Sequence, residues 1–108
     1  MSEHYRIVYS RNAKEDLKDI YRYIAFQFFA PDTAREQVDR IRTVIRSLST
    51  FPDRHARVEW EPWAGLGVRK VPADRYTVYY LPDQDNHTVT IVRIFYSGRN
   101  IEKIISGS

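Results

Sequence analysis

The sequence has 108 residues, of which 43% are hydrophobic and 29% charged, the proportions of an ordinary globular chain. It contains no cysteine, which excludes disulfides, thiolate metal sites and cysteine nucleophiles, and no apolar run approaches the roughly 18 residues of a membrane span. The length predicts a single domain over residues 1–108, and the formal net charge of +3 mildly favours anionic partners such as nucleic acid or an acidic protein.

The first half of the chain is typical of one strand followed by two helices. Residues 5–9 alternate and contain β-formers, which predicts a strand. Asn12 with Glu15 resembles a capping box that opens a helix, and Pro31 ends that helix. Its apolar face is expected to hold Leu17, Ile20, Tyr21, Ile24 and Phe28.

A second helix is predicted to follow at once, with Asp32 or Thr33 as its cap. Its apolar stripe consists of Ala34, Val38, Ile41, Val44, Ile45 and Leu48. The charged residues between them favour a solvated face over a binding stripe. The two helices are therefore expected to form an α-hairpin.

After the helices the hydrophobic period changes to that of strands. Strand-like segments occupy 58–60, 67–71, 76–81 and 88–96, with "EPWAGLG", "PAD" and "PDQDN" as turn-like separators. The segment "NIEKII" predicts a short last helix capped by Asn100. This order predicts an α+β fold with an N-terminal strand, an α-hairpin, a mostly antiparallel three- to four-stranded sheet and a short C-terminal helix. One sheet face is then covered by the hairpin, and the other is closed by a partner or forms a working surface.

Positive charge is concentrated on these strands and at their ends. Arg93 interrupts an apolar face of the segment 88–96, while Arg69 and Lys70 fall in another strand. Further cations, Arg75 and Arg99, stand next to strand ends. Gathered cations repel one another unless an anion neutralises them, and arginine suits phosphate because its fork binds two oxygens at once. The structural alternative is that Arg93 pairs with an acidic residue and holds strand register, the candidates being Asp74, Glu59 and Glu61.

The chemistry that such a set supports is limited. The sequence has no Gly-rich phosphate loop, no Ser-His-Asp order and no metal-ligand spacing among its three histidines, so no metal or cofactor is expected. Metal-free RNA cleavage is possible if cations stabilise the phosphate, Tyr96 acts as the acid, and Glu61 or Lys70 acts as the base. The alternatives are that Tyr96 is a packed aromatic and Glu61 an ordinary loop residue.

The chain resembles the RelE/ParE superfamily of bacterial type II toxins over nearly its whole length. The likeness rests on the order and spacing of "YRIVYSRNAKEDLKDIYRYI", "APDTAREQVDRI", "SLSTFP", "GVRKVPADRYTVYYL" and "VTIVRIFYSGRNIEKII". The resemblance implies an α-hairpin packed on an antiparallel sheet, a bacterial cytoplasmic location, and neutralisation by a small antitoxin protein. RelE-like and YoeB-like members cleave mRNA on the ribosome, whereas ParE-like members inhibit DNA gyrase and lack the nuclease residues.

The resemblance carries features of both branches. Arg69 and Lys70 match a basic pair of the nucleases, and Arg93 and Tyr96 match an arginine and a terminal tyrosine of YoeB-like chains. Glu61 loosely resembles the glutamate of their "PEP" segment. Against this, Tyr76 replaces an arginine of the nucleases, Phe95 replaces a histidine, and "DRYTVYY" is similar to the ParE-type pattern.

From these features the sequence predicts a toxin that acts as a metal-independent mRNA interferase on ribosome-bound mRNA. The expected catalytic residues are Lys70, Arg93, Tyr96 and Glu61, and the expected nucleic-acid-binding residues are Arg69, Arg75 and Arg99. Two alternatives stay open, a ParE-like toxin that inhibits DNA gyrase without cleaving RNA, and a non-toxic module that only binds the antitoxin.

Overall fold

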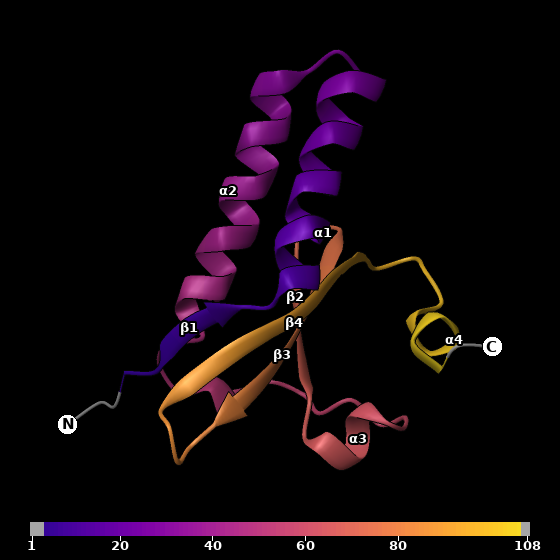
Figure 1. Ribbon diagram of the computed structural model, residues 1–108. Helices are drawn as coiled ribbons and strands as arrows, with labels where there is room; N and C mark the ends of the chain where they lie inside the picture. Colours follow the sequence, from indigo (N-terminus) through magenta and orange to yellow (C-terminus); the bar gives the residue numbers. More distant parts are fainter. Residues whose placement is uncertain (1–3, 107–108) are drawn as a thin grey trace.

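The computed structural model describes residues 4–106 and shows a helical hairpin packed against one side of a four-stranded sheet (Figure 1). The strands are β1 (Arg6–Tyr9), β2 (Arg69–Ala73), β3 (Tyr76–Asp83) and β4 (Thr88–Tyr96). The helices are α1 (Arg11–Arg22), α2 (Pro31–Ser47), α3 (Trp63–Leu66) and α4 (Ile101–Ser106), with a π-helical turn at Tyr23–Gln27 and a 3₁₀ turn at Pro52–Arg54.

The sheet has the strand order β1-β4-β3-β2. Strand β4 pairs with β3 in the antiparallel sense and with β1 in the parallel sense, and β3 pairs antiparallel with β2. The predicted α+β class and mostly antiparallel sheet are therefore confirmed, and the segment 88–96 forms a strand with the predicted bounds. The central position of β4 explains why both of its faces are largely apolar.

The start of α1 differs from the prediction. Ser10, not Asn12, is the cap, since its hydroxyl oxygen accepts a hydrogen bond from the backbone N–H of Ala13 at 3.0 Å. The same hydroxyl donates to the carbonyl of Val92 at 2.9 Å. Ser10 directly follows β1, so one side chain can begin the helix and hold it against β4.

The hairpin and the inner face of the sheet enclose the main core. The buried side of α1 and α2 includes Leu17, Ile41 and Ile45, and the sheet contributes Tyr80 and Ile91 among others. The Tyr80 hydroxyl, deep in this core, donates to the carbonyl of Pro52 at 2.6 Å. Burial raises the pKa of Tyr80 to about 12. The predicted apolar stripe of α2 is thus a core stripe.

At the end of α1 the expectation for Phe28 is wrong. The helix widens into the π-helical turn at Tyr23–Gln27, and Phe28 is 63% exposed. Phe26, within this turn, and Phe29, just after it, are exposed as well. Pro31 then opens α2, which is the position where proline costs a helix least, because its missing N–H has no helical acceptor there. The tip of the hairpin therefore presents aromatic side chains to solvent.

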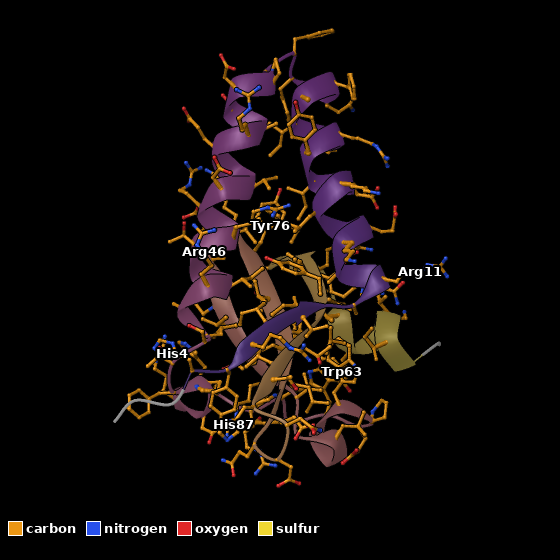
Figure 2. The ribbon with its side chains drawn as sticks, turned by 60° about the vertical axis from the view of Figure 1, so that its left-hand side comes forward. His4, Arg11, Arg46, Trp63, Tyr76 and His87 are labelled. Atoms are coloured by element: carbon orange, nitrogen blue, oxygen red, sulfur yellow. The ribbon has the colours of Figure 1, made fainter. Side chains whose placement is uncertain are left out.

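The outer face of the sheet is partly closed by the chain itself. A second apolar cluster on that face consists of Val58, Trp63, Val68, Tyr79, Phe95 and Ile101. Trp63 stacks on Trp60 and packs against Tyr79, with ring centroids 5.0 Å apart in both cases. Figure 2 shows Tyr76 close to the helical layer and Trp63 at the far side of the sheet. The chain itself therefore covers part of this face, so the face is not wholly open and needs a partner for only part of its cover.

The predicted strand at 58–60 is wrong. Only Arg57 forms a bridge, with Arg69, and the N–H of Val58 donates to the carbonyl of Val68 at 2.9 Å. The following segment turns into α3, because the two tryptophans gain more by packing on Tyr79 than by extending along the sheet.

Across residues 4–106, no helix combines the length and apolarity that a membrane crossing requires.

Candidate functional site

A groove of about 1010 Å³ lies between the helical hairpin, the end of β4 and α4. Four of the seven predicted site residues line it, namely Arg75, Arg93, Tyr96 and Arg99. They come from three places, because Arg75 belongs to the β2–β3 turn, Arg93 and Tyr96 to β4, and Arg99 to the loop before α4. The register explains the gathering: Tyr76, at the start of β3, lies opposite Tyr96, at the end of β4.

Arg93 is bound to Asp16 of α1 through both ends of its guanidinium group. Its Nε donates to Oδ2 of Asp16 at 2.8 Å and its Nη2 donates to Oδ1 at 3.0 Å. The Asp16 side chain is only 10% exposed and the Arg93 side chain 26%. The guanidinium carbon also lies 4.3 Å from the centre of the Phe95 ring. The positive charge of Arg93 is therefore already neutralised within the chain.

The same aspartate completes the edge of the sheet. Strand β1 pairs with β4 only from Thr88 to Ile91, so among the described residues no strand covers the rest of β4 on that side. Helix α1 takes over there, and Oδ2 of Asp16 accepts the backbone N–H of Ile94 at 2.9 Å. An exposed strand edge is a site for unwanted pairing, and Asp16 closes it with a charge-assisted hydrogen bond.

The acidic residues expected to pair with Arg93 do not do so. Asp74 instead accepts hydrogen bonds from Arg40 Nε at 2.5 Å and from Gln37 Nε2 at 3.1 Å. The bond from Arg40, followed by that from Gln37, lowers the pKa of the Asp74 carboxyl below its usual value. This contact ties α2 to the β2–β3 turn, on the wall of the groove next to Arg75.

Two tyrosines form the rim of the groove at the sheet end. The rings of Tyr76 and Tyr96 meet edge to face with centroids 5.9 Å apart, and Tyr96 is 49% exposed. A Cβ atom at Gly98 would lie 2.8 Å from Cε2 of Tyr96, so glycine is needed where the loop passes this ring. Burial raises the pKa of Tyr76, and the neighbouring Tyr96 and Tyr23 raise it further.

Besides Arg40, which is paired with Asp74, the exposed cations that line the groove are Arg75 and Arg99. Among residues 4–106, no carboxylate lies within 4.0 Å of either guanidinium group. Arg99 lies over the ring of Phe95, with its guanidinium carbon 5.3 Å from the ring centre. These two arginines are therefore available to an anionic group from outside.

Lys70, Arg69 and Glu61 do not line the groove. Lys70 lies opposite Tyr79, which lies opposite Arg93, so about 10 Å of sheet separates Lys70 from Arg93. Arg69 donates to the carbonyl of His55 at 2.6 Å and secures the loop after α2.

Glu61 lies just before the short helix α3, where its carboxylate accepts the N–H of Gly65 at 3.0 Å. In the part of the chain that the structure describes, no three His, Asp or Glu side chains gather so as to hold a metal ion.

The residues that sequence reasoning missed are Asp16, Gln37 and Arg40. A signal for Asp16 existed, because Ala13, Asp16, Leu17 and Ile20 follow the spacing of a single helical face. An acidic residue on an apolar stripe requires a buried partner, since an unpaired charge there is costly. Gln37 has the same position between Ala34 and Ile41, and it too is buried and bonded.

Three comparisons relate this chain to known proteins. A family model described as "ParE toxin of type II toxin-antitoxin system, parDE" matches residues 7–101. A structure of a chromosomal ParDE system from P. aeruginosa is similar, with a TM-score of 0.69, 21% identity, and coverage of 86% of this chain and 96% of that one. The RelBE2 toxin–antitoxin complex from Mycobacterium tuberculosis is also similar, with a TM-score of 0.64, 19% identity, and coverage of 87% and 92%. No curated protein sequence matches the chain. At these identities the two structures show a common fold.

Proposed function

The chain belongs to the ParE toxin family of type II toxin–antitoxin systems, and from this premise we propose that it inhibits DNA gyrase and does not cleave RNA. We further propose that a cognate antitoxin neutralises it, as expected for the toxin of such a pair. The two similar structures are both described as toxin–antitoxin systems, which supports this partner.

The observation that carries the proposal is the state of the carboxylates around Tyr96. RNA cleavage without a metal needs a general base close to the 2′-hydroxyl and an acid at the leaving oxygen. Among the residues that line the groove, the acidic ones are Asp16 and Asp19. Asp16 accepts three hydrogen bonds, two of them from Arg93, and Asp19 is paired with Arg22 at 3.3 Å. The Asp16 carboxylate is therefore not free to act as the base, and Asp19 lies in a surface ion pair whose side chains are 58% and 69% exposed.

The predicted nuclease residues are also divided between separate places. Lys70 lies about two strands from Arg93, and Glu61 is engaged at α3. Catalysis requires that the base, the acid and the charge-stabilising group reach one phosphate together. The roles of Lys70, Arg93, Tyr96 and Glu61 in RNA cleavage therefore have less support than a binding role for the groove.

The composition of the groove suits a protein target. Tyr23, Phe28 and Tyr96 are exposed along it, and Arg75 and Arg99 have no carboxylate partner among the described residues. Aromatic residues and arginine are the types enriched at the energetic centres of protein interfaces. We propose that this groove contacts gyrase, with Tyr96 as an aromatic anchor and the two arginines as partners for acidic groups.

The proposal is tested by adding purified toxin to gyrase and measuring supercoiling and trapped DNA cleavage complexes. We expect inhibition by the wild-type protein and by Tyr96→Phe, which keeps the ring and loses only the hydroxyl. Tyr96→Ala should weaken inhibition about tenfold or more, the scale of an interface anchor. Arg57→Ala, an exposed change outside the groove, is the matched control and should be neutral.

The mRNA interferase is the second candidate, supported by Tyr96, Arg75 and Arg99 around one groove. It predicts that ribosome-bound mRNA is cleaved in a translating extract, with and without EDTA, and that Tyr96→Phe abolishes cleavage. Cleavage with no effect on gyrase would replace the proposal by this candidate. A protein that arrests growth in neither way and still binds its antitoxin would be a non-toxic binding module.

A further inference from the structure

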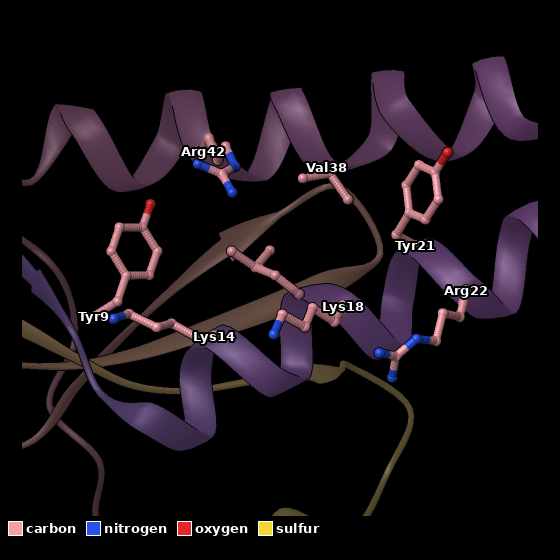
Figure 3. Close-up of a pocket in the computed structure, with 8 residues that line it drawn as sticks. Tyr9, Lys14, Lys18, Tyr21, Arg22, Val38 and Arg42 are labelled. Atoms are coloured by element: carbon pink, nitrogen blue, oxygen red, sulfur yellow. The ribbon is translucent and has the colours of Figure 1, made fainter.

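A second cavity, of about 510 Å³, lies on the opposite side of α1 from the groove. Figure 3 shows it between the two helices of the hairpin and the end of β1. Tyr9 ends β1, Lys14 and Tyr21 come from α1, and Arg42 comes from α2. It shares no lining residue with the groove, so it is a separate site.

The polar groups of this cavity are cations and hydroxyls. Its lining residues are Tyr9, Lys14, Leu17, Lys18, Tyr21, Arg22, Val38 and Arg42, a set that contains no carboxylate. Lys18 and Arg22 have acidic neighbours on the exposed side of α1, Glu15 at 3.6 Å and Asp19 at 3.3 Å. Among residues 4–106, no carboxylate lies within 4.0 Å of Lys14 or Arg42.

The spacing of these cations is unfavourable for the helix alone. Lys14, Lys18 and Arg22 are four residues apart in turn, so they follow one side of α1. Like charges at this spacing destabilise a helix, and Arg42 adds a fourth positive charge from the facing helix. A bound anion would remove this repulsion.

The two tyrosines place hydroxyl groups in the same space. In Figure 3 the hydroxyls of Tyr9 and Tyr21 are both directed toward α2, on either side of Arg42 and Val38. Tyr9 is half-buried, and burial raises the pKa of its hydroxyl while the nearby Arg42 and Arg46 lower it. The Tyr9 hydroxyl is thus a protonated donor next to positive charge.

We propose that this cavity binds a phosphate-bearing ligand. Lysine, arginine and tyrosine supply donors to the oxygens of a multiply charged anion, and the arginine fork binds two of them at once. Leu17 and Val38 provide an apolar floor for the organic part of such a ligand. The volume lies within the roughly 300–1,000 Å³ of ordinary ligand pockets. The phosphate belongs either to a free nucleotide or polyphosphate, or to the backbone of a nucleic acid.

The experiment measures binding of three probes to the full-length protein by titration calorimetry: tripolyphosphate, ATP and a short single-stranded RNA. We expect at least one phosphate compound to bind with a dissociation constant in the millimolar range or tighter. Arg42→Gln should weaken binding about tenfold, and Tyr9→Phe severalfold, through the loss of donors to a charged group. Arg35→Gln, on the same helix but outside the cavity, is the matched control and should be neutral.

The three probes distinguish the source of the phosphate. Binding of ATP or tripolyphosphate that Arg42→Gln weakens assigns a small phosphate ligand, and binding of RNA alone that Arg42→Gln weakens assigns a nucleic-acid backbone. Binding of any probe that Arg42→Gln leaves unchanged lies outside this cavity and overturns the proposal. The proposal is overturned if no probe binds, or if Arg35→Gln weakens binding as much as Arg42→Gln. It is also overturned if polyglutamate displaces every phosphate probe at equal charge concentration, since the cavity would then be an acidic-protein site. Circular dichroism verifies that each variant is folded. If Arg42→Gln does not fold, Lys14→Gln is tested in its place.

Discussion

Two arginine–aspartate pairs hold the helical hairpin to the sheet, and they differ in almost every physical respect. The Asp16–Arg93 pair is largely buried, joins both ends of the guanidinium group and also bonds the backbone of β4. The Arg40–Asp74 pair has side chains 54% and 41% exposed and shares its aspartate only with Gln37. Because water screens the second pair and hardly reaches the first, the two should contribute very differently to stability.

Removal of the buried carboxylate should have the largest effect. Asp16→Ala leaves the Arg93 charge without its partner and the Ile94 N–H without an acceptor. We expect a loss of about 3–5 kcal/mol in the free energy of unfolding, the usual cost of breaking a buried ion pair. Urea denaturation measures it, with Asp19→Ala as the exposed control on the same helix. A loss equal to that of the control would show that the edge of β4 needs no closure.

The loss on the arginine side should be smaller. Arg93→Met keeps the volume of the side chain near Phe95, and Asp16 still accepts the N–H of Ile94. We expect a loss of about 2 kcal/mol, typical of hydrogen bonds to charged groups.

The same denaturation, applied to the double variant of Asp16→Ala and Arg93→Met, isolates the pair. The loss in the double variant should be about 1–2 kcal/mol smaller than the sum of the losses in the two single variants, because neither charge is then left alone. Full additivity would mean that the two side chains do not interact in solution.

Ser10 gives a third, weaker test of the same edge. Ser10→Ala removes the cap of α1 and the bond to the carbonyl of Val92. We expect a loss of about 1 kcal/mol, the ordinary cost of an N-cap. Asn12→Ala, at the cap position suggested by the sequence, is the control. Asn12→Ala should be almost neutral. A larger loss for Asn12→Ala than for Ser10→Ala would show that Asn12 is the cap.

The exposed pair should show the smallest effect and a pH dependence. The pKa of Asp74 is lower in the folded protein than its usual value, so the folded state favours the ionised form. Its contribution to stability is therefore present above the unfolded pKa and lost as the pH falls through the folded pKa.

Asp74→Asn should lower the unfolding midpoint slightly at neutral pH and not at strongly acidic pH. Thermal melts of wild type and variant across the acidic range measure this difference. A difference that stays constant with pH would exclude an ionised Asp74 as its source.

The success of the sequence predictions depended on how local each signal was. The strand at 88–96 was predicted with its bounds because a run of β-formers between turn residues indicates a strand without reference to distant parts of the chain. The strand at 58–60 was wrong because the packing of Trp60 and Trp63 on Tyr79, in another strand, decided the local conformation. The cap of α1 was misplaced because Ser10 is held by Val92, which is distant in sequence.

The predictions for the candidate site also depended on how local their signals were. Tyr96 and Arg99 lie together because they follow one another along the chain, and Arg75 joins them through the register of β3 and β4. Lys70 and Glu61 were grouped with them by residue type alone, and their places depend on strand order and on the α3 loop. Residue type indicates what chemistry is available, but only spatial proximity brings it to one place.

By itself the sequence determined the order of the elements, the α+β class and the succession of motifs that resembles the RelE/ParE toxins, because these depend on hydrophobic period and local turn chemistry. Only the tertiary structure decided which arginines are free. Arg93 is neutralised by an aspartate 77 residues away, whereas Arg75 and Arg99 have no such neighbour in the described chain. Charge pairing acts over a few ångströms of space, and no pattern along the chain encodes that distance.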